Sequence, residues 1–279
     1  MRRVHPSAYT HEYYLTDCTG YREFKKKFGL KLEPRLARIT AEMPLPRDLR
    51  VLDIGCGRGE MVAWAARKGA SHAEGVDYST AAVLLAKKAQ KNWPKSLKNR
   101  TNFRHMDAKK LKFPDASFDA VFLVEVLEHL YPEEQVVVMH EVYRVLKSDG
   151  FVFAHTAPSR WFNDYSYRVW SYPISSVLVG AWNKLLRKNY GNLLPPDKLR
   201  SKSHKIMHVA EPDYFSLKKL FADTGFFGGI GSTNITVLKP VISWKDTLFN
   251  FIVYLHPFSK FFPLNVFFGA DFYAILRKK

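Results

Sequence analysis

Short apolar runs recur between residues 50 and 154, and segments with helical patterns separate them. Helices are expected at 60–67 and 80–91, and another ends near residue 147. Strands that alternate with helices in this way predict an α/β fold with a mostly parallel sheet. The predominantly apolar run at 118–124 is typical of a strand in the middle of such a sheet. Strands are expected at 51–52, 72–77, 103–108, 118–124 and 151–154.

The alternation breaks at residue 156 and resumes at Glu211. Residues 156–210 form a first insertion, rich in aromatic and basic residues, which we expect to cap a substrate. A second aromatic insertion covers 239–268. The aromatic residues of the two insertions include Trp161, Phe162, Tyr165, Tyr167, Trp170, Tyr172, Trp182, Tyr190, Trp244, Phe249, Phe251, Tyr254, Phe258, Phe261, Phe262, Phe267 and Phe268.

The rest of the sheet is expected between and after these insertions. A helix at 217–223, capped by Ser216, ends at Gly225, because glycine readily adopts the left-handed conformation at a helix end. A strand is expected at 235–238 and a last one at 272–276. This order predicts a reversed hairpin at the sheet edge, with the second insertion at its tip or bend.

The chain has 279 residues, of which 47% are hydrophobic, enough for one α/β domain with decorations. No apolar run approaches the roughly 18 residues that a membrane-spanning helix needs. The N-terminus lacks the apolar stretch of a signal peptide. Two distant cysteines, Cys18 and Cys56, predict neither a disulfide framework nor a metal site. A reduced, cytoplasmic protein is therefore expected.

An excess of 43 Lys and Arg over 26 Asp and Glu gives a formal net charge of +17. The basic residues cluster at 87–112 and 160–210. Such a surface attracts nucleic acid, anionic lipid headgroups or phosphorylated intermediates, although the first cluster is also compatible with an ordinary solvated helix face. The Trp and Phe residues of the insertions favour contact with an anionic membrane surface. The alternative is a hydrophobic mini-core with these rings turned inward.

The turn after the first strand carries the strongest chemical signal. Asp53 is followed by glycines at alternate positions, Gly55, Gly57 and Gly59. Glycine tolerates positive φ and lacks a Cβ, so the backbone of this strand–helix turn can approach a ligand closely. A dinucleotide fingerprint would need glycine where this chain has Glu60. Taken alone, the turn is also compatible with a tight structural connection.

The run Asp53-x-Gly55-x-Gly57-x-Gly59 resembles the first motif of the class I S-adenosylmethionine (SAM) methyltransferases. Further segments resemble the branch of that family that includes ubiquinone and menaquinone C-methyltransferases and many natural-product and glycan O-methyltransferases. The resemblance implies a Rossmann-like, doubly wound sheet of seven strands, and SAM as the cofactor. It covers 48–156 well and 211–228 more loosely. The further matching segments follow in order at 72–77, 103–108, 113–130 and 143–154.

The resemblance also assigns residues to the cofactor site. Asp53 and the glycine turn would hold the amino-acid end and ribose of SAM, Asp77 the ribose hydroxyls, and Asp107 the adenine amino group. Asp77 capping the next helix, and Asp107 as a solvated loop residue, are the alternatives. The residues expected at the cofactor site are Asp53, Gly55, Cys56, Gly57, Gly59, Asp77, Tyr78, Asp107, Ala108 and Glu125.

Methyl transfer from a sulfonium needs alignment in a dry pocket, and a hydroxyl acceptor also needs a general base. No metal is required. If the chain turns helical after residue 124, Glu125 and His129 share a helical face and His129 is a candidate base. A local packing role for His129 is the alternative. His155 is the second candidate, and further ones are Asp164, His204 and His208.

Four parts are expected: a cap or lid at 1–46, the SAM-binding core at 47–155, the substrate cap at 156–210, and the remaining sheet at 211–279. Tyr21 and Arg22 are candidate lid residues, with packing against the core as the alternative.

The predicted function is SAM-dependent methylation of a small-molecule or lipid-linked acceptor, such as a glycan, quinone or polyprenyl intermediate. Oxygen is the atom that we expect to be methylated. The alternatives are an RNA-binding protein or RNA methyltransferase, and a non-catalytic SAM-binding protein. Methylation of adenine amino groups is disfavoured, because Glu125-Val126-Leu127 stands where that chemistry has an Asn/Asp-Pro-Pro-aromatic run.

Overall fold

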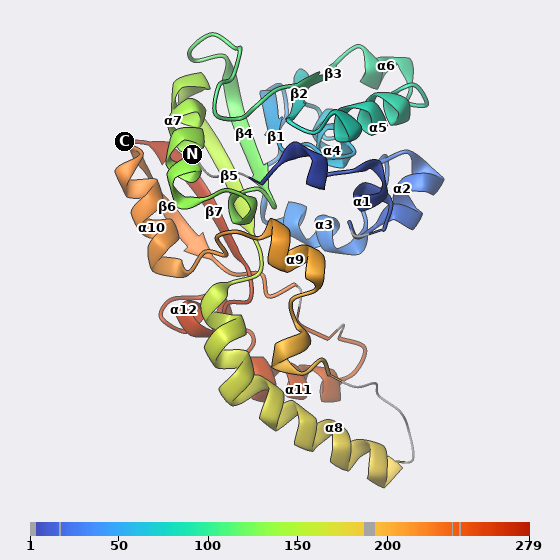
Figure 1. Ribbon diagram of the computed structural model, residues 1–279, viewed down its shortest axis with the longest axis vertical. Coiled ribbons are helices and arrows are strands. Elements are labelled where there is room, and N and C mark those ends of the chain that lie inside the picture. Colours follow the sequence, from blue (N-terminus) through green and yellow to red (C-terminus); the bar gives the residue numbers. More distant parts are fainter. Residues whose placement is uncertain (1–3, 17, 187–192, 236, 240) are drawn as a thin grey trace.

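A seven-stranded sheet, in the order β3-β2-β1-β4-β5-β7-β6, organises the described part of the chain (Figure 1). The computed structural model describes residues 4–16, 18–186, 193–235, 237–239 and 241–279. Strands β1 to β5 run parallel, whereas β7 runs antiparallel to both β5 and β6. The doubly wound α/β fold with a reversed terminal hairpin is therefore confirmed. The strands are β1 (Arg50–Ile54), β2 (His72–Asp77), β3 (Thr101–His105), β4 (Phe118–Val124), β5 (Leu146–Thr156), β6 (Phe226–Gly231) and β7 (Phe272–Lys278).

Helices cover both faces of this sheet and also build two additions to it, one before β1 and one below the sheet in Figure 1. The α-helices of the described residues are α1 (His11–Thr16), α2 (Tyr21–Lys27), α3 (Pro34–Ile39), α4 (Glu60–Arg67), α5 (Thr80–Gln90), α6 (Lys95–Lys98), α7 (Pro132–Val145), α8 (Tyr172–Leu186), α9 (Lys202–Met207), α10 (Tyr214–Asp223), α11 (Trp244–Tyr254) and α12 (Leu264–Phe268).

The central strand β4 is buried on both sides. Ala120, Phe122 and Val124 pack into one apolar cluster, while Val121 and Leu123 pack into another. Because side chains alternate along a strand, each cluster marks one face of the sheet. Helices α4 and α5 contribute buried residues to the first cluster, and α7 and α10 contribute to the second. This double layer leaves the ends of the strands as the place where a ligand can enter.

The prediction of a strand at 235–238 is wrong, because residues 235, 237 and 238 do not form one. Residue 236 lies outside the described residues. The strand forms earlier, as β6, where the backbone passes so close to β7 that a Cβ on Gly228 would lie 2.1 Å from the Ile275 oxygen. Residues 233–235 instead fold around the buried carboxylate of Asp271, which accepts hydrogen bonds from their N–H groups at 2.7–3.0 Å. A buried charge therefore turns this segment into a loop.

Helix α10 begins at Tyr214, earlier than the predicted start at residue 217. Its N-cap is Asp213, not Ser216: the Asp213 carboxylate accepts hydrogen bonds from the N–H groups of Phe215 and Ser216, both at 3.0 Å. A carboxylate at this end is also favoured by the helix dipole. The helix ends as expected at Gly225, which has φ +84°.

The two insertions pack against each other and form a lobe that extends away from the sheet (Figure 1). Their shared core includes Phe162, Tyr167, Val253 and Tyr254, so the three aromatic rings of this set do turn inward. Many others in the lobe are exposed, whereas Tyr190 lies outside the described residues. No helix in the described ranges has both the length and the apolar character needed to cross a bilayer.

Candidate active site

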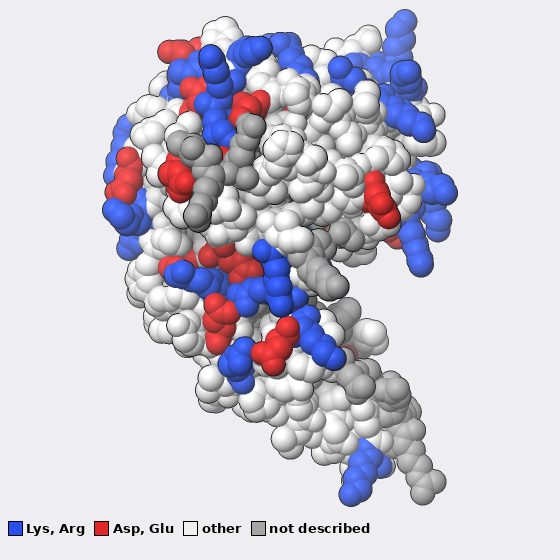
Figure 2. Space-filling view, viewed as in Figure 1, with Lys and Arg blue, Asp and Glu red and all other residues white. Residues whose placement is uncertain are grey.

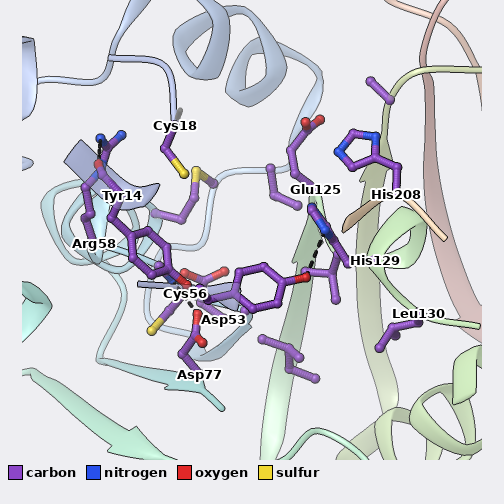
Figure 3. Close-up of a pocket in the computed structure, with 18 of the residues that line it drawn as sticks. Tyr14, Cys18, Asp53, Cys56, Arg58, Asp77, Glu125, His129, Leu130 and His208 are labelled. Atoms are coloured by element: carbon purple, nitrogen blue, oxygen red, sulfur yellow. Dashed lines mark hydrogen bonds between the residues drawn. The ribbon is translucent and has the colours of Figure 1, made fainter. Parts of the chain in front are cut away.

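The carboxyl ends of β1, β2 and β4 meet at one edge of the sheet and line a cavity of about 520 Å³. Ligands of open α/β sheets bind at this edge, where the strand order reverses. Figure 3 shows Asp53, Cys56 and Asp77 at one end of the cavity and Glu125, His129 and His208 at the other. The predicted site residues that line it are Asp53, Gly55, Cys56, Gly57, Asp77, Tyr78, Asp107, Ala108, Glu125 and His129.

The glycine turn contributes to the cavity wall through its first two glycines. Gly55 and Gly57 have φ of +69° and +51°, and a Cβ on Gly57 would meet nothing closer than Tyr14 at 3.9 Å. Gly59, expected at the cofactor site, is not on the wall. Its φ is +88°, and a Cβ there would lie 2.6 Å from the Phe103 ring. Gly59 therefore serves the packing of the turn against β3 rather than ligand contact.

Asp53 lies buried at the end of β1. Its Oδ2 has no hydrogen-bond partner among the described residues. Burial, together with the charges of Asp77 and Glu60, raises the pKa of Asp53 well above its usual range. A buried carboxylate oxygen without a partner is costly, so this position fits a ligand that brings a donor, such as an amino group.

Asp77 is the acid at the end of β2. Its two carboxylate oxygens accept hydrogen bonds from the N–H groups of Gly57 at 3.0 Å and Ser79 at 2.8 Å. Burial raises the pKa of Asp77 to about 6, although these hydrogen bonds oppose the shift. Asp77 thus fixes the shape of the glycine turn and still lines the cavity. The neighbouring Tyr78 also lines it and donates a hydrogen bond to the Val4 carbonyl at 2.9 Å.

Asp107 and Ala108 follow β3 and complete this side of the cavity. The Asp107 carboxylate accepts a hydrogen bond from the Lys109 N–H at 2.9 Å, and the Lys109 ammonium lies 3.5 Å away. Asp107 keeps accepting capacity for a ligand group, because each carboxylate oxygen offers two lone pairs.

Glu125 and His129 do not share a helical face, so that expectation is wrong. Glu125 has φ +59°, and Leu127–His129 make a single 3₁₀ turn. Glu125 forms ion pairs with Arg35 and with His155, whose Nδ1 lies 2.6 Å from Oε1. Burial opposes ionisation here, but Arg35 and His155 outweigh it and lower the pKa of Glu125 to about 2.

His129 lines the end of the cavity away from Asp53, and its Nδ1 lies 3.0 Å from the Tyr9 hydroxyl. Burial lowers the pKa of His129 to about 4, so the imidazole is unprotonated at neutral pH. The same ring packs against His208, with centroids 4.7 Å apart. His129 therefore remains a candidate base.

His155 does not line the cavity. It is buried, with Nδ1 2.6 Å from Glu125 and Nε2 3.7 Å from Asp271. Burial disfavours its charge, but the two carboxylates outweigh burial and raise the pKa of His155 to about 9. An imidazolium held between two acids cannot take a proton from an acceptor, so the structure does not support His155 as a base. Of the further candidates, His204 and His208 line the cavity, whereas Asp164 pairs with Arg200 at 2.7 Å.

Sequence reasoning missed Arg58, the residue between the second and third glycines of the turn. Its buried guanidinium donates to the carbonyls of Tyr14 at 3.0 Å and Thr19 at 2.6 Å, and to Glu60 at 2.9 Å. It thereby fastens the segment before β1 over the cavity. Neither Tyr21 nor Arg22 is on the cavity wall. A bulky cation inside a glycine turn was the available signal, because such a side chain must leave the turn and bind something.

These features define an α/β domain with a nucleoside-sized crevice at its strand ends. Residues 52–154 match the family model described as a methyltransferase domain. The matched residues, 52–154, therefore form a domain of the class I SAM-dependent methyltransferase type, as the motifs indicated, and SAM is the cofactor of this class. The unpartnered Asp53 oxygen and the open space beside Gly57 fit a ligand with an amino group and a close backbone approach.

Two curated relatives each match less than half of the chain. Methyltransferase GfsG of Streptomyces halstedii is 35% identical over 101 residues, which cover 36% of this chain and 35% of that protein. The 27-O-demethylrifamycin SV methyltransferase of Amycolatopsis mediterranei is 33% identical over 113 residues, or 40% of each protein. The chain thus spans well under half the length of either relative in these alignments.

A SAM-dependent methyltransferase from Mesorhizobium loti has a similar structure, with a TM-score of 0.58 and 16% identity. The likeness covers 89% of this chain and 100% of that one. At this identity it shows the fold alone.

Proposed function

We propose that this protein uses SAM to methylate an oxygen of a small-molecule or lipid-linked acceptor. One cavity joins the motif residues to the first insertion, and this observation carries the proposal. Asp53 and Asp77 lie at one end, and His204 and His208 line the wall that the insertion contributes. Donor and acceptor can therefore meet in one space, as an in-line transfer requires. The O-demethylrifamycin named in one relative supports oxygen as the methylated atom.

Each residue at the cofactor end has a role in holding and shielding. Asp53 would accept from the amino group of SAM, Asp77 from the ribose hydroxyls and Asp107 from the adenine amino group. When bound, SAM supplies a methyl group already activated by the positive sulfur. Arg58 would exclude water by holding the N-terminal segment closed over the cavity, and Tyr14 lines the same wall.

We also propose that the lobe rests on an anionic membrane surface. Trp244, Phe258, Phe261 and Phe262 are more than half exposed, and exposed aromatic surface of this extent favours a partner. On the face seen in Figure 2 the far end of the lobe is largely uncharged, while Lys and Arg side chains, interspersed with Asp and Glu, lie between it and the sheet. Aromatic rings at the interface and cations against headgroups are the combination that peripheral proteins use.

The test is incubation of the protein with isotopically labelled SAM and fractionated lipid, small-molecule and RNA extracts, followed by mass spectrometry. Label in a lipid or small-molecule fraction supports the proposal and names the acceptor class. Label confined to RNA would favour the RNA methyltransferase alternative. In that case the affinity of the protein for RNA should also fall steeply as the salt concentration rises. Binding of S-adenosylhomocysteine without label in any fraction would favour the non-catalytic alternative. An Asp53→Asn variant is the control for each fraction.

A further inference from the structure

Three polar side chains converge at the acceptor end of the cavity. Glu128, His129 and His208 each offer one ligand atom, and these atoms lie within 4.8 Å of one another. Glu128 and His129 follow β4, whereas His208 follows α9 in the first insertion. Figure 3 shows His129 and His208 close together, beyond Glu125 and away from Asp53.

Two atoms of this cluster have no partner of their own. Glu128 is fully buried, and its Oε2 accepts a hydrogen bond from the Thr156 hydroxyl at 2.7 Å. Its Oε1 is buried and has no hydrogen-bond partner among the described residues, and the same holds for His208 Nδ1. Buried polar atoms are almost always satisfied, because leaving them bare costs free energy. Polar atoms without a partner on two of three converging side chains indicate a missing cation.

We infer that Glu128, His129 and His208 bind a divalent transition-metal ion of the zinc type. Two imidazoles and one carboxylate are a protein ligand set of open zinc sites, whose fourth position holds water or substrate. Bonds of about 2.0–2.1 Å in a tetrahedron separate ligand atoms by about 3.3 Å, so side-chain rotation must close the cluster by at most about 1.5 Å.

The surroundings suit such an ion. The Thr156 hydroxyl orients Glu128, and the Tyr9 hydroxyl lies 3.0 Å from His129 Nδ1. Such outer contacts fix the geometry of metal ligands. The nearby positive charge of Arg35 is already paired with Glu125, which limits its repulsion of a cation.

The ligand at the open position follows from the proposed function, on which this step rests. His129 and His208 line the cavity, so the fourth position faces the acceptor. An acceptor hydroxyl bound there would have its pKa lowered by the ion and would release its proton to water. His129 would then act as a metal ligand, and its lone pair would not be available for a base.

Calorimetric titration of the full chain with zinc chloride tests the site. One tight ion per chain is expected for the unaltered protein. His208→Ala and Glu128→Gln are expected to weaken binding at least about tenfold, since even outer-shell changes cost that much. His140→Ala, which removes an exposed histidine of α7, is the matched control and is expected to bind as the parent does.

Equal zinc affinity in the parent and both ligand variants, or no binding by the parent, would overturn the inference. X-ray absorption of the zinc-loaded parent needs no variant: two imidazole nitrogens and a carboxylate oxygen are expected, and sulfur ligands would contradict the site. S-adenosylhomocysteine titration of the same samples separates the proposals. Zinc binding without nucleoside binding would contradict the proposed function but not the ion site, and the converse would remove the ion site alone.

Discussion

Asp53 shows how one side chain can serve binding at the expense of stability. Its buried oxygen without a partner and its raised pKa both mean that the folded protein disfavours the ionised form. The same negative charge is what an amino group of the ligand would bind. Functional sites commonly keep such locally unfavourable groups.

Asp53→Asn is therefore expected to weaken S-adenosylhomocysteine binding at least tenfold while raising the unfolding temperature of the ligand-free protein. A gain of about 1 kcal/mol would raise it by about 2–4 °C in a domain of this size. Calorimetry and thermal unfolding measure the two effects. Asp119→Asn is the control: Asp119 is paired with Lys147 at 2.6 Å, so its loss should lower the unfolding temperature. A lower unfolding temperature for Asp53→Asn would contradict this account.

His155 makes a pH-dependent contribution to stability. Its folded pKa of about 9 lies above the ordinary 6.5, so protonation stabilises the fold fully below pH 6.5. That stabilisation is lost as the pH rises from 6.5 through 9. The stability advantage of the parent over His155→Gln, measured as free energy of unfolding in urea, should shrink between pH 6 and 9.5.

The buried acid Asp77 cancels in that comparison. Burial raises its pKa to about 6, but it is present in the parent and in the variant. Glu128 does not cancel: burial and the charge of Glu125 raise its pKa to about 8, whereas the charge of His155, which the variant lacks, lowers it. A difference in unfolding free energy that stays constant across this range would show that His155 is not held as an imidazolium.

The sequence could predict Asp53, Gly57 and Asp77 on the cavity wall because their positions are set locally, by two strand ends and a turn. It could not place His155 correctly, since its charge depends on Asp271, a residue far along the chain that only the sheet brings beside it. The positive φ of Glu125 was likewise invisible in a pattern that looked helical. Residue roles that depend on distant partners need the fold.

At the scale of elements, the segment before β1 is held by hydrogen bonds to its backbone. Arg58 donates to two carbonyls of this segment, at Tyr14 and Thr19, and Ser79 donates to the Tyr9 carbonyl at 2.9 Å. The aromatic side chains of α1 and its flanks then cover the cavity. The segment can therefore act as a lid whose stability depends on Arg58.

Arg58→Lys tests this lid. Lysine keeps a positive charge near Glu60, but its single ammonium lacks the planar fork that reaches both carbonyls. Dissociation of S-adenosylhomocysteine, followed by stopped flow, should be about tenfold faster, and limited proteolysis should cut sooner before residue 46. Arg22→Ala, in the same segment but away from the cavity, is the control. Equal dissociation rates for the parent and Arg58→Lys would show that Arg58 does not hold the lid closed.

The strand predicted at 235–238 shows that local sequence preferences take no account of tertiary contacts. Residues 235–238 include β-branched types that favour strands, while β6 is rich in glycine, which disfavours them. Tertiary contacts reverse both preferences: Asp271 gathers residues 233–235, and the close approach of β7 requires Gly228. Strands β1, β4 and β5 were predictable because their apolar runs match burial in a parallel sheet.

At the scale of the whole molecule, the lobe gives the protein a surface unlike the rest of it. Phe261 and Phe262 are 67% and 64% exposed beside Lys260, on a chain with a net charge of +17. Buried rings explain how the lobe folds, but not why these remain outside. Contact with an anionic membrane would bury them and would bring a lipid-linked acceptor to the cavity that His204 of α9 lines.

Cosedimentation with anionic vesicles at low salt tests that contact. The double change Phe261→Ser and Phe262→Ser is expected to weaken binding at least tenfold, because burying each ring contributes about 1.5–3 kcal/mol. Phe227→Ser is the matched control, since Phe227 is 53% exposed but lies on the edge strand β6. It should bind as the parent does, and added salt should weaken all three by screening the lysines and arginines. If the parent fails to bind these vesicles, or if Phe227→Ser loses as much binding as the double change, the exposed rings of the lobe are not a membrane surface.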